Sequence, residues 1–402
     1  MNPRDVVFIS ACRTPIGKMS GQFANLTARD LAITAGAEAI KRAGIDPKAI
    51  NEVVMGEVLM GAAGSLPAMQ VAHRLGVAPE VFGCTINQNC SSGMRALEAA
   101  ADHIALGKSD ISLVIGVESM TAAPYLLDKA RQGYRMGDGK IADSMLRDAL
   151  VDELSGGHMG MTSENVAEMY GITREECDAL AVMSHERANA AIAAGKFKKE
   201  IVPVVIKSKK GEKVIDTDEH PIPNCTMETM AKMAPAFKRD GGVTTAGNAS
   251  GVNDAAAAVI IMSAEKAKEL GLTPMAKVLH ICAAGVEPRI MGVGPAKAIP
   301  KCLKAAGVDF NDVDYWEINE AFAAQFIGAG KMLEEESGMK LDMTKVNRNG
   351  SGISLGHPIG CTALRIVVSL LHEMEREDLK IGGASMCVGA GPAMCGLFSR
   401  DV

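Results

Sequence analysis

Segments that are apolar at nearly every position alternate with alanine-rich helical segments in this chain of 402 residues. Residues 6–11 and 111–116 are two of these apolar runs. Residues 28–43, between them, have helical spacing, with Thr27 placed to cap the helix and Gly44 to end it. A strand without a polar face has to be covered on both sides, so the alternation predicts a mixed or parallel sheet enclosed by helices. The expected fold class is therefore α/β.

A more polar stretch, residues 121–248, interrupts the alternation. It contains one clear predicted helix over residues 174–194, which begins with a capping box, and a lysine-rich run over residues 196–213. We interpret this stretch as a loop domain that is inserted over the core.

The alternation resumes after this insertion and echoes the first part of the chain. The glycine-rich turn at residues 347–352 leads into a predicted helix that ends near His372, and residues 379–386 form a predicted strand like residues 110–120. Such an echo predicts two similar halves that meet at a shared site. We divide the chain into a first half (residues 1–120, completed by 249–272), the inserted loop domain (121–248) and a second half (273–402).

Charge and composition exclude several classes of function. The net charge of −6 does not provide the general basic surface that binds nucleic acid. No apolar run reaches the roughly 18–20 residues of a membrane span, and the N-terminus lacks a signal-peptide pattern, so we expect a cytoplasmic protein without a membrane partner. The ten cysteines have no zinc-type spacing, which favours reduced thiols and no metal site.

Cys90 is the first candidate for chemistry. It lies between a short strand near Thr85 and a predicted helix over residues 92–106. Free N–H groups and the dipole at a helix N-terminus stabilise a thiolate. The alternative is a buried structural cysteine, which is what most cysteines are.

Three further residues follow predicted strands or lie in glycine-rich turns. His357, in Gly-His-Pro-Ile-Gly, can serve as the general base for a cysteine. Cys387 opens a Cys-Val-Gly-Ala-Gly turn, whose N–H groups can bind an oxyanion and whose thiol can move a proton. Asn319 can hold a water or a carbonyl oxygen. The alternatives are structural turns for His357 and Cys387 and a helix N-cap for Asn319.

Two other motifs lie next to predicted helices. His158 precedes a helix that we expect to begin near Ser163, so it can either cap that helix or contact a ligand. The small-residue loop at residues 247–251 precedes a predicted apolar helix over residues 255–261. This loop can let an extended ligand lie against the backbone.

Taken together and in this order, the motifs resemble those of the thiolase family. The match runs from residue 9 to beyond residue 387, nearly the whole chain, and the ordered set is far more specific than any one motif. The matching stretches are residues 9–17, 87–93, 158–162, 247–251, 291–295, 319–323, 356–360 and 387–389.

The resemblance implies two similar halves in a five-layered αβαβα core. It also implies an acyltransferase that cleaves a 3-ketoacyl-CoA with CoA, or condenses acetyl-CoA with an acyl-CoA. Cys90 would carry the acyl group, Cys387 would move the α-proton, and His357 would activate Cys90. His357 and a water on Asn319 would bind the enolate oxygen, and the N–H groups of Cys90 and Gly389 would form a second oxyanion hole.

The resemblance further implies a pocket for the pantetheine arm of CoA, which is a substrate and product, with no tightly bound cofactor. Such an enzyme belongs to fatty acid metabolism and is a homodimer or a homotetramer. The lysine-rich run is an expected contact for the CoA phosphates. The residues expected to line the tunnel are His158, Phe237, Ala249, Ser250, Ala321 and Phe322, and those expected to border it or the acyl pocket are Leu150, Met159 and Met291.

Departures from the family pattern leave two rival interpretations open. Ala390 replaces the middle glycine of Cys-x-Gly-Gly-Gly, which is expected to narrow the reaction pocket, and residues 334–342 form a charged insertion. One rival is a decarboxylating ketoacyl synthase, although such enzymes carry one cysteine with two histidines, or with His and Asn. The other is a thiolase-like partner protein with weak activity, against which the intact Cys90, His357 and Cys387 argue.

Overall fold

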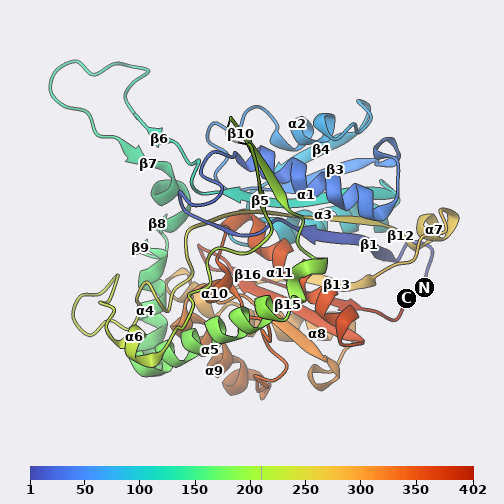
Figure 1. Cartoon of the computed structure of the whole chain (residues 1–402). Helices are drawn as coiled ribbons and strands as arrows, with labels where there is room; N and C mark the ends of the chain where they lie inside the picture. Colours follow the sequence, from blue (N-terminus) through green and yellow to red (C-terminus); the bar gives the residue numbers. More distant parts are fainter. Residues whose placement is uncertain (210) are drawn as a thin grey trace.

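Two similar halves of one mixed sheet form the frame of the molecule (Figure 1). The computed structural model describes residues 1–209 and 211–402. In the first half, β3 pairs in parallel with β4 and β5, while β12 pairs antiparallel with β5 and β1. In the second half, β14 pairs in parallel with β15, while β16 pairs antiparallel with β15 and β13. The strands are β1 (Val6–Arg13), β3 (Glu52–Gly56), β4 (Phe82–Ile86), β5 (Ile111–Ser119), β12 (Asn253–Ser263), β13 (Ala276–Gly285), β14 (Tyr315–Ile318), β15 (Ile381–Cys387) and β16 (Pro392–Ser399), with β2 (Gly17–Lys18) beside β12.

The two halves therefore have the same strand order, which confirms the predicted internal repeat. They are not separate sheets, because β1 and β13 pair at two positions, Val7 with Lys277 and Phe8 with Ala276. One hydrogen-bonded path thus runs from β14 to β4.

Three layers of helices alternate with the two halves of the sheet, which gives the five layers of the core. Adjacent residues of a strand point to opposite faces, so Val53 and Met55 pack against the outer helices of the first half while Val54 packs against the middle layer. The first outer layer is α1 (Ala28–Ala43) and α2 (Pro67–Arg74), the middle layer is α3 (Ser92–Ala105) and α11 (Ile359–Arg376), and the second outer layer includes α8 (Pro295–Ala306) and α9 (Ala323–Ser337). This confirms the expected fold class.

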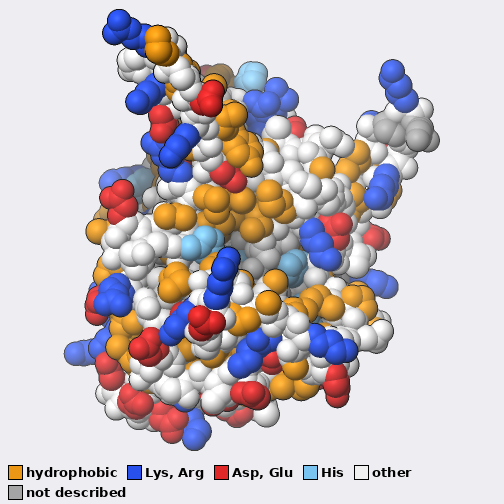
Figure 2. Space-filling model, turned by 90° about the vertical axis from the view of Figure 1, so that its left-hand side faces the viewer, with side chains coloured by type: hydrophobic (Ala, Val, Ile, Leu, Met, Phe, Trp, Pro, Cys, Tyr) orange, Lys and Arg blue, Asp and Glu red, His pale blue; other side chains and the backbone are white. Residues whose placement is uncertain are grey.

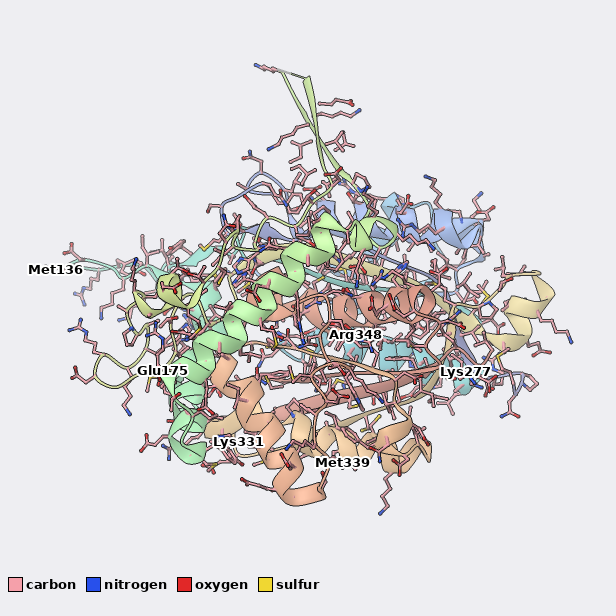
Figure 3. The ribbon with its side chains drawn as sticks, turned by 60° about the horizontal axis from the view of Figure 1, so that its bottom comes forward. Met136, Glu175, Lys277, Lys331, Met339 and Arg348 are labelled. Atoms are coloured by element: carbon pink, nitrogen blue, oxygen red, sulfur yellow. The ribbon has the colours of Figure 1, made fainter. Side chains whose placement is uncertain are left out.

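The inserted segment contains more regular structure than the sequence predicts. The capped helix α5 (Arg174–Ala193) agrees with its prediction, and Figure 3 shows it crossing one side of the molecule from the end near Glu175. The helix α4 (Met159–Tyr170) begins at Met159 rather than near Ser163. The other elements are β6 (Tyr125–Leu126), β7 (Ala142–Asp143), a π-helical turn (Leu146–Leu150), β8 (Val151–Asp152), β9 (Gly157–His158), η3 (Lys196–Lys199), β10 (Val204–Ser208), β11 (Gly211–Ile215) and α6 (Met227–Ala231).

Elements of the inserted segment lie on one face of the molecule. Strand β9 and helix α4 lie on the left in Figure 1, and Figure 2 looks onto that side, where hydrophobic side chains gather near the centre. The arm between β6 and β7 projects away from the body, with Met136 at its far end (Figures 1 and 3). No helix in the described part of the chain is long and apolar enough to cross a membrane.

Two predicted helices are wrong in type or extent. Residues 255–261, predicted as a helix, form the centre of β12, whose residues are all buried. Pairing with β1 on one side and β5 on the other outweighs the helix propensity of the alanines. The helix predicted after residues 347–352 is divided into α10 (Gly352–Leu355) and α11, because Gly356 and Pro358 lie between them. The remaining short helices are η1 (Pro47–Ala49), α7 (Ala264–Glu269), η4 (Pro288–Val293) and η5 (Phe310–Asp312).

The contact between α3 and α11 generates a first prediction. A Cβ on Gly93 of α3 would lie 2.9 Å from the backbone N of Leu364 on α11, so Gly93→Ala forces the two helices apart. We expect a loss of about 1–3 kcal/mol in the free energy of unfolding, measured by urea denaturation. Gly330→Ala is the matched control, because a Cβ there meets nothing closer than 3.6 Å. This variant should be at least as stable as the wild type, since alanine favours a helix more than glycine does. Equal stability of the two variants would contradict the close approach.

Candidate active site

One pocket of about 250 Å³ collects nearly all the predicted site residues. Cys90 comes from the first half, whereas His357 and Cys387 come from the second half. Asn319 is the one predicted residue that does not line it. The other predicted residues in its wall are Gly389, Leu150, His158, Met159, Phe237, Ala249, Ser250, Met291, Ala321 and Phe322.

Cys90 lies in a tight turn immediately before α3. The N–H of Ser91 donates to the carbonyl of Gln88 at 3.2 Å, and the N–H of Ser92 donates to the carbonyl of Asn89 at 3.0 Å. Burial raises the pKa of the Cys90 thiol to about 11, although the N–H groups of Gly389 and Cys90 itself lower it. The N–H donors thus favour the thiolate, as expected, but burial outweighs them. Cys90 rests as a thiol and needs a base.

His357 has the protonation state that such a base requires. Burial, and then the charge of Arg365, lower the pKa of His357 to about 3, so the ring is neutral. The hydroxyl of Thr362 donates to the carbonyl of Pro358 at 2.9 Å and lies 2.7 Å from Nδ1 of His357. That hydroxyl has one proton, so we assign the ring proton to Nδ1, which leaves a lone pair on Nε2. Nε2 has no protein partner among the described residues, as a general base at the pocket requires.

Cys387 provides a second thiol at the inner end of β15. Burial raises the pKa of Cys387 far above its ordinary value, and a negative charge on Cys90 raises it further. A charge on one thiol therefore disfavours a charge on the other. A protonated Cys387 can act as an acid toward a carbanion in the same pocket.

Asn319 lies behind the pocket. It follows β14, it is fully buried, and its N–H donates to the carbonyl of Ser385 at 3.0 Å. Helix α9 begins at Ala323, so the N-cap interpretation is wrong. Neither side-chain atom of Asn319 has a hydrogen-bond partner within the described chain, and a buried amide without partners fits an ordered water.

Aromatic rings form the outer part of the pocket. The ring of His158 stacks on Phe237 with 4.7 Å between centroids, and Phe237 meets Phe322 edge-on at 6.2 Å. Nδ1 of His158 also accepts the N–H of Gly160 at 3.0 Å, so His158 both caps α4 and lines the pocket. The N–H of Ser250 donates to the carbonyl of Ala321 at 2.9 Å, which fixes the small-residue loop as one wall.

Glu118 supports the pocket, and sequence reasoning missed it. Its carboxylate accepts the N–H groups of Val58 and Leu59 at 3.1 Å and that of Gly360 at 3.0 Å. It therefore joins the first half to the beginning of α11. Burial and the neighbouring Glu57 raise the pKa of Glu118 to about 8. A single charged residue in the buried strand β5 was the available sequence signal.

The sequence also missed several residues in the wall of the pocket. They are Asn89, Met120, Ala149, Gly251, Val252 and Ile359. By contrast, Ala390 does not line the pocket, so the expected narrowing is wrong. Its φ of +74° places it in the left-handed region, where a methyl group costs about 1–2 kcal/mol.

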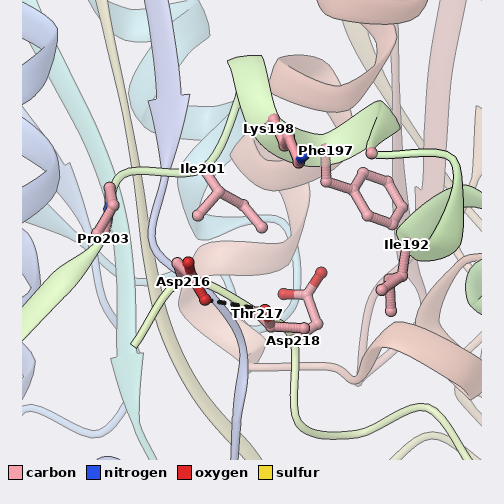
Figure 4. Close-up of a pocket in the computed structure, with 9 residues that line it drawn as sticks. Ile192, Phe197, Lys198, Ile201, Pro203, Asp216, Thr217 and Asp218 are labelled. Carbon is pink, nitrogen blue, oxygen red and sulfur yellow. Dashed lines mark hydrogen bonds between the residues drawn. The ribbon is translucent and has the colours of Figure 1, made fainter. Parts of the chain in front are cut away.

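A second pocket lies between η3 and residues 216–218 (Figure 4). It contains none of the predicted site residues. Its buried acid, Asp218, is bound by the guanidinium of Arg13 at 2.7 and 2.9 Å, so the charge is already paired. Lys198 lines this pocket, whereas none of the described residues of the lysine-rich run lines the pocket of Cys90. Among the described residues no cluster of His, Cys, Asp or Glu could hold a metal ion.

Comparisons with known proteins agree with this geometry. The model of the thiolase N-terminal domain matches residues 6–265, and that of the thiolase C-terminal domain matches residues 272–400. The acetyl-CoA acetyltransferase of Syntrophomonas wolfei is 50% identical over 390 residues, covering 96% of this chain and 97% of that one. That of Escherichia coli K12 is 46% identical over 398 residues, covering 99% of both.

Solved structures give the same result. The structure of acetyl-CoA acetyltransferase from Syntrophomonas wolfei has a TM-score of 0.98 at 58% identity and covers 99% of both chains. Human mitochondrial 3-ketoacyl-CoA thiolase in complex with CoA has a TM-score of 0.93 at 38% identity and covers 98% of both. The chain belongs to the thiolase family and is an acyltransferase with thiolase activity. The two rival interpretations are not favoured.

The charge of Glu118 generates a second prediction. A carboxyl whose pKa is raised on folding stabilises the protein at low pH, and this contribution is lost as pH rises from about 4.5 toward about 8. Glu118→Gln does not titrate, so the free energy of unfolding of the wild type should fall relative to this variant over that range, by about 1 kcal/mol or more. Denaturant titrations at several pH values measure the difference. The control Glu335→Gln, at an exposed position, should show no such change, and a pH-independent difference for Glu118→Gln would contradict the assignment.

Proposed function

We propose that this thiolase cleaves 3-ketoacyl-CoA with CoA, and catalyses the reverse condensation, through an acyl group on Cys90. The observation that carries the proposal is the meeting of three groups at one pocket: the thiols of Cys90 and Cys387 and the free Nε2 of His357. Each has the protonation state that its step requires.

The cleavage direction begins at Cys90. Nε2 of His357 takes the proton of the Cys90 thiol, and the sulfur attacks the keto carbon of the substrate. The bond between the α-carbon and the keto carbon then breaks, which leaves an acyl group on Cys90 and an acetyl-CoA enolate. The thiol of Cys387 gives its proton to the enolate carbon. Free CoA next attacks the acyl group, and its thiol proton returns to the enzyme as acyl-CoA leaves and Cys90 is freed.

Two sets of donors would stabilise the oxygen anions of these steps. The N–H groups of Cys90 and Gly389 both lower the pKa of the Cys90 thiol, and they would donate to the oxygen of a thioester on that sulfur. His357 and a water on Asn319 would serve the enolate oxygen. Removal of one well-placed donor in such a site costs roughly 3–4 kcal/mol.

CoA and a short acyl chain fit the walls of the pocket. The pantetheine arm would lie along Ser250, Phe322 and His158, which line one part of the pocket. Apolar side chains such as Met120 and Leu150 also line it and would contact the acyl chain. Since the similar enzymes of Syntrophomonas wolfei and Escherichia coli are named acetyl-CoA acetyltransferases, we propose acetoacetyl-CoA as the principal ketoacyl substrate. A role in fatty acid metabolism and a cytoplasmic location stay predictions, as does the division into domains.

Thiolysis of acetoacetyl-CoA beside a medium-chain 3-ketoacyl-CoA tests the function. We expect acetoacetyl-CoA to be cleaved faster, and intact-mass analysis without CoA should show an acyl group on the protein. Cys90→Ser should lose the adduct, because its hydroxyl is a far weaker nucleophile than a thiol. Cys387→Ser should keep the adduct but exchange the α-hydrogens of acetyl-CoA more slowly. A full adduct on Cys90→Ser would refute the mechanism.

A homodimer is the simplest assembly that the surface supports. Strand β4 is the end of the hydrogen-bonded path, and among the described residues it pairs only with β3. Phe82 is 50% exposed on this edge and Cys84 is also exposed. An unpaired edge with exposed apolar side chains is suited to pairing with a second copy. The projecting arm, with Met136 97% exposed, would then join two dimers into a tetramer.

Charges on the edge strand test this assembly. Phe82→Lys combined with Cys84→Lys should convert the protein to a monomer, because like charges would face each other across the pairing. The molar mass from light scattering after size exclusion measures the result. Met136→Lys, at the arm, should leave a dimer but remove any tetramer. An edge variant that keeps the wild-type mass would show that β4 is not the interface.

A further inference from the structure

Asn89, the residue before the nucleophile, is held in an unusual backbone conformation. Its φ of +46° lies in the left-handed region, which asparagine tolerates better than most residues. Its N–H donates to Oδ1 of Asn87 at 2.9 Å. Its carbonyl accepts both the N–H of Ser92, at 3.0 Å, and the hydroxyl of Ser92, at 2.7 Å. The backbone on both sides of Asn89 is therefore fixed.

The side chain of Asn89 connects the two halves of the molecule. Its Nδ2 donates to the carbonyl of Gly389 at 3.2 Å, across 300 residues of sequence. Within the described chain, this is the one side-chain hydrogen bond between residues 87–91 and residues 387–391. Asn89 and Gly389 both lie in the wall of the reaction pocket.

Gly389 is closely enclosed at the point where it meets Asn89. A Cβ on Gly389 would lie 2.8 Å from Cε of Met159 and 3.3 Å from Nδ2 of Asn89. The N–H of Gly389 lowers the pKa of the Cys90 thiol, which places this N–H on the side of the sulfur. The N–H and the carbonyl of Gly389 flank the same Cα, so a bond to the carbonyl limits rotation about both. Glycine has more freedom to rotate than any other residue, and the bond from Asn89 removes that freedom.

We propose that Asn89 is a positioning residue, whose amide holds Gly389 so that its N–H stays directed at the acyl oxygen on Cys90. This role rests on the proposed function. Asn89 makes its contribution through Gly389 and takes no part in proton transfer. Its loss should therefore slow acyl transfer at Cys90 and leave the binding of the CoA thioester nearly unchanged.

Two variants separate the amide from the backbone conformation. Asn89→Gly keeps the left-handed conformation without strain but deletes the donor. Asn89→Asp keeps the shape and the tolerance for positive φ, but it presents a carboxylate oxygen to the carbonyl of Gly389. Asn165→Asp is the matched control, because Nδ2 of Asn165 also donates to a backbone carbonyl, that of Arg289 at 2.9 Å, outside the pocket.

The measurement is the rate of Cys90 acetylation by acetyl-CoA, followed by rapid quench and intact mass, together with kcat and KM for acetoacetyl-CoA thiolysis. Both Asn89 variants should acetylate at least about tenfold more slowly than the wild type, which corresponds to about 1.4 kcal/mol. Their KM values should stay within about twofold, whereas Asn165→Asp should behave as the wild type. Thermal unfolding shows whether each variant is folded. If Asn89→Asp does not fold, the acetylation rate of Asn89→Gly alone tests the role of the amide.

Three outcomes would overturn the proposal. Acetylation of Asn89→Gly at the wild-type rate would show that the amide is not needed. A slow Asn89→Gly with a normal Asn89→Asp would show that no donor is needed. A rise in KM with kcat unchanged would make Asn89 a binding residue instead. Failure of the proposed function is distinguishable, because it would appear as a wild-type protein that neither acetylates nor cleaves acetoacetyl-CoA.

Discussion

The packing of α3 against α11, in the middle layer, is the constraint on which the active site depends. Both helices pack between the two halves of the sheet, and each begins at the pocket. Gly93 allows the two backbones to approach, because a Cβ there would lie 2.9 Å from Leu364. Glu118 then ties Gly360, at the start of α11, to the loop after β3. Cys90 and His357 meet because these two helix starts cannot separate without opening a buried core.

Burial also determines how the chemistry proceeds. It raises the pKa of Cys90 to about 11 and lowers that of His357 to about 3, so the two groups are neutral at rest. A charged pair would exist only while the proton moves and the sulfur attacks, with N–H donors already in place for the new oxygen anion. The same burial keeps Cys387 protonated until a carbanion forms beside it. A preorganised, largely apolar pocket thus replaces a permanently ionised nucleophile.

The sequence predicted the repeated α/β halves, because buried strands and helix caps are local signals. The resemblance of its ordered motifs to those of a known family then supplied about two thirds of the residues in the pocket wall. Sequence reasoning mistook residues 255–261 for a helix, since a strand covered on both faces carries the same apolar run as a buried helix. It missed Glu118 and Asn89, whose partners are far away in the sequence. The strand–helix junction predicted N–H donors that favour a thiolate at Cys90, whereas the amount of burial, which decides the pKa, is a property of the folded chain.

The charge state of the resting nucleophile tests this account most directly. The ultraviolet absorbance of the thiolate, recorded against pH for the wild type and for Cys90→Ser, isolates Cys90 by difference. We expect no difference near neutral pH and a thiolate signal that appears only as pH approaches about 11. A difference already present at neutral pH would mean a resting thiolate–imidazolium pair, and would contradict a neutral thiol that His357 deprotonates during attack.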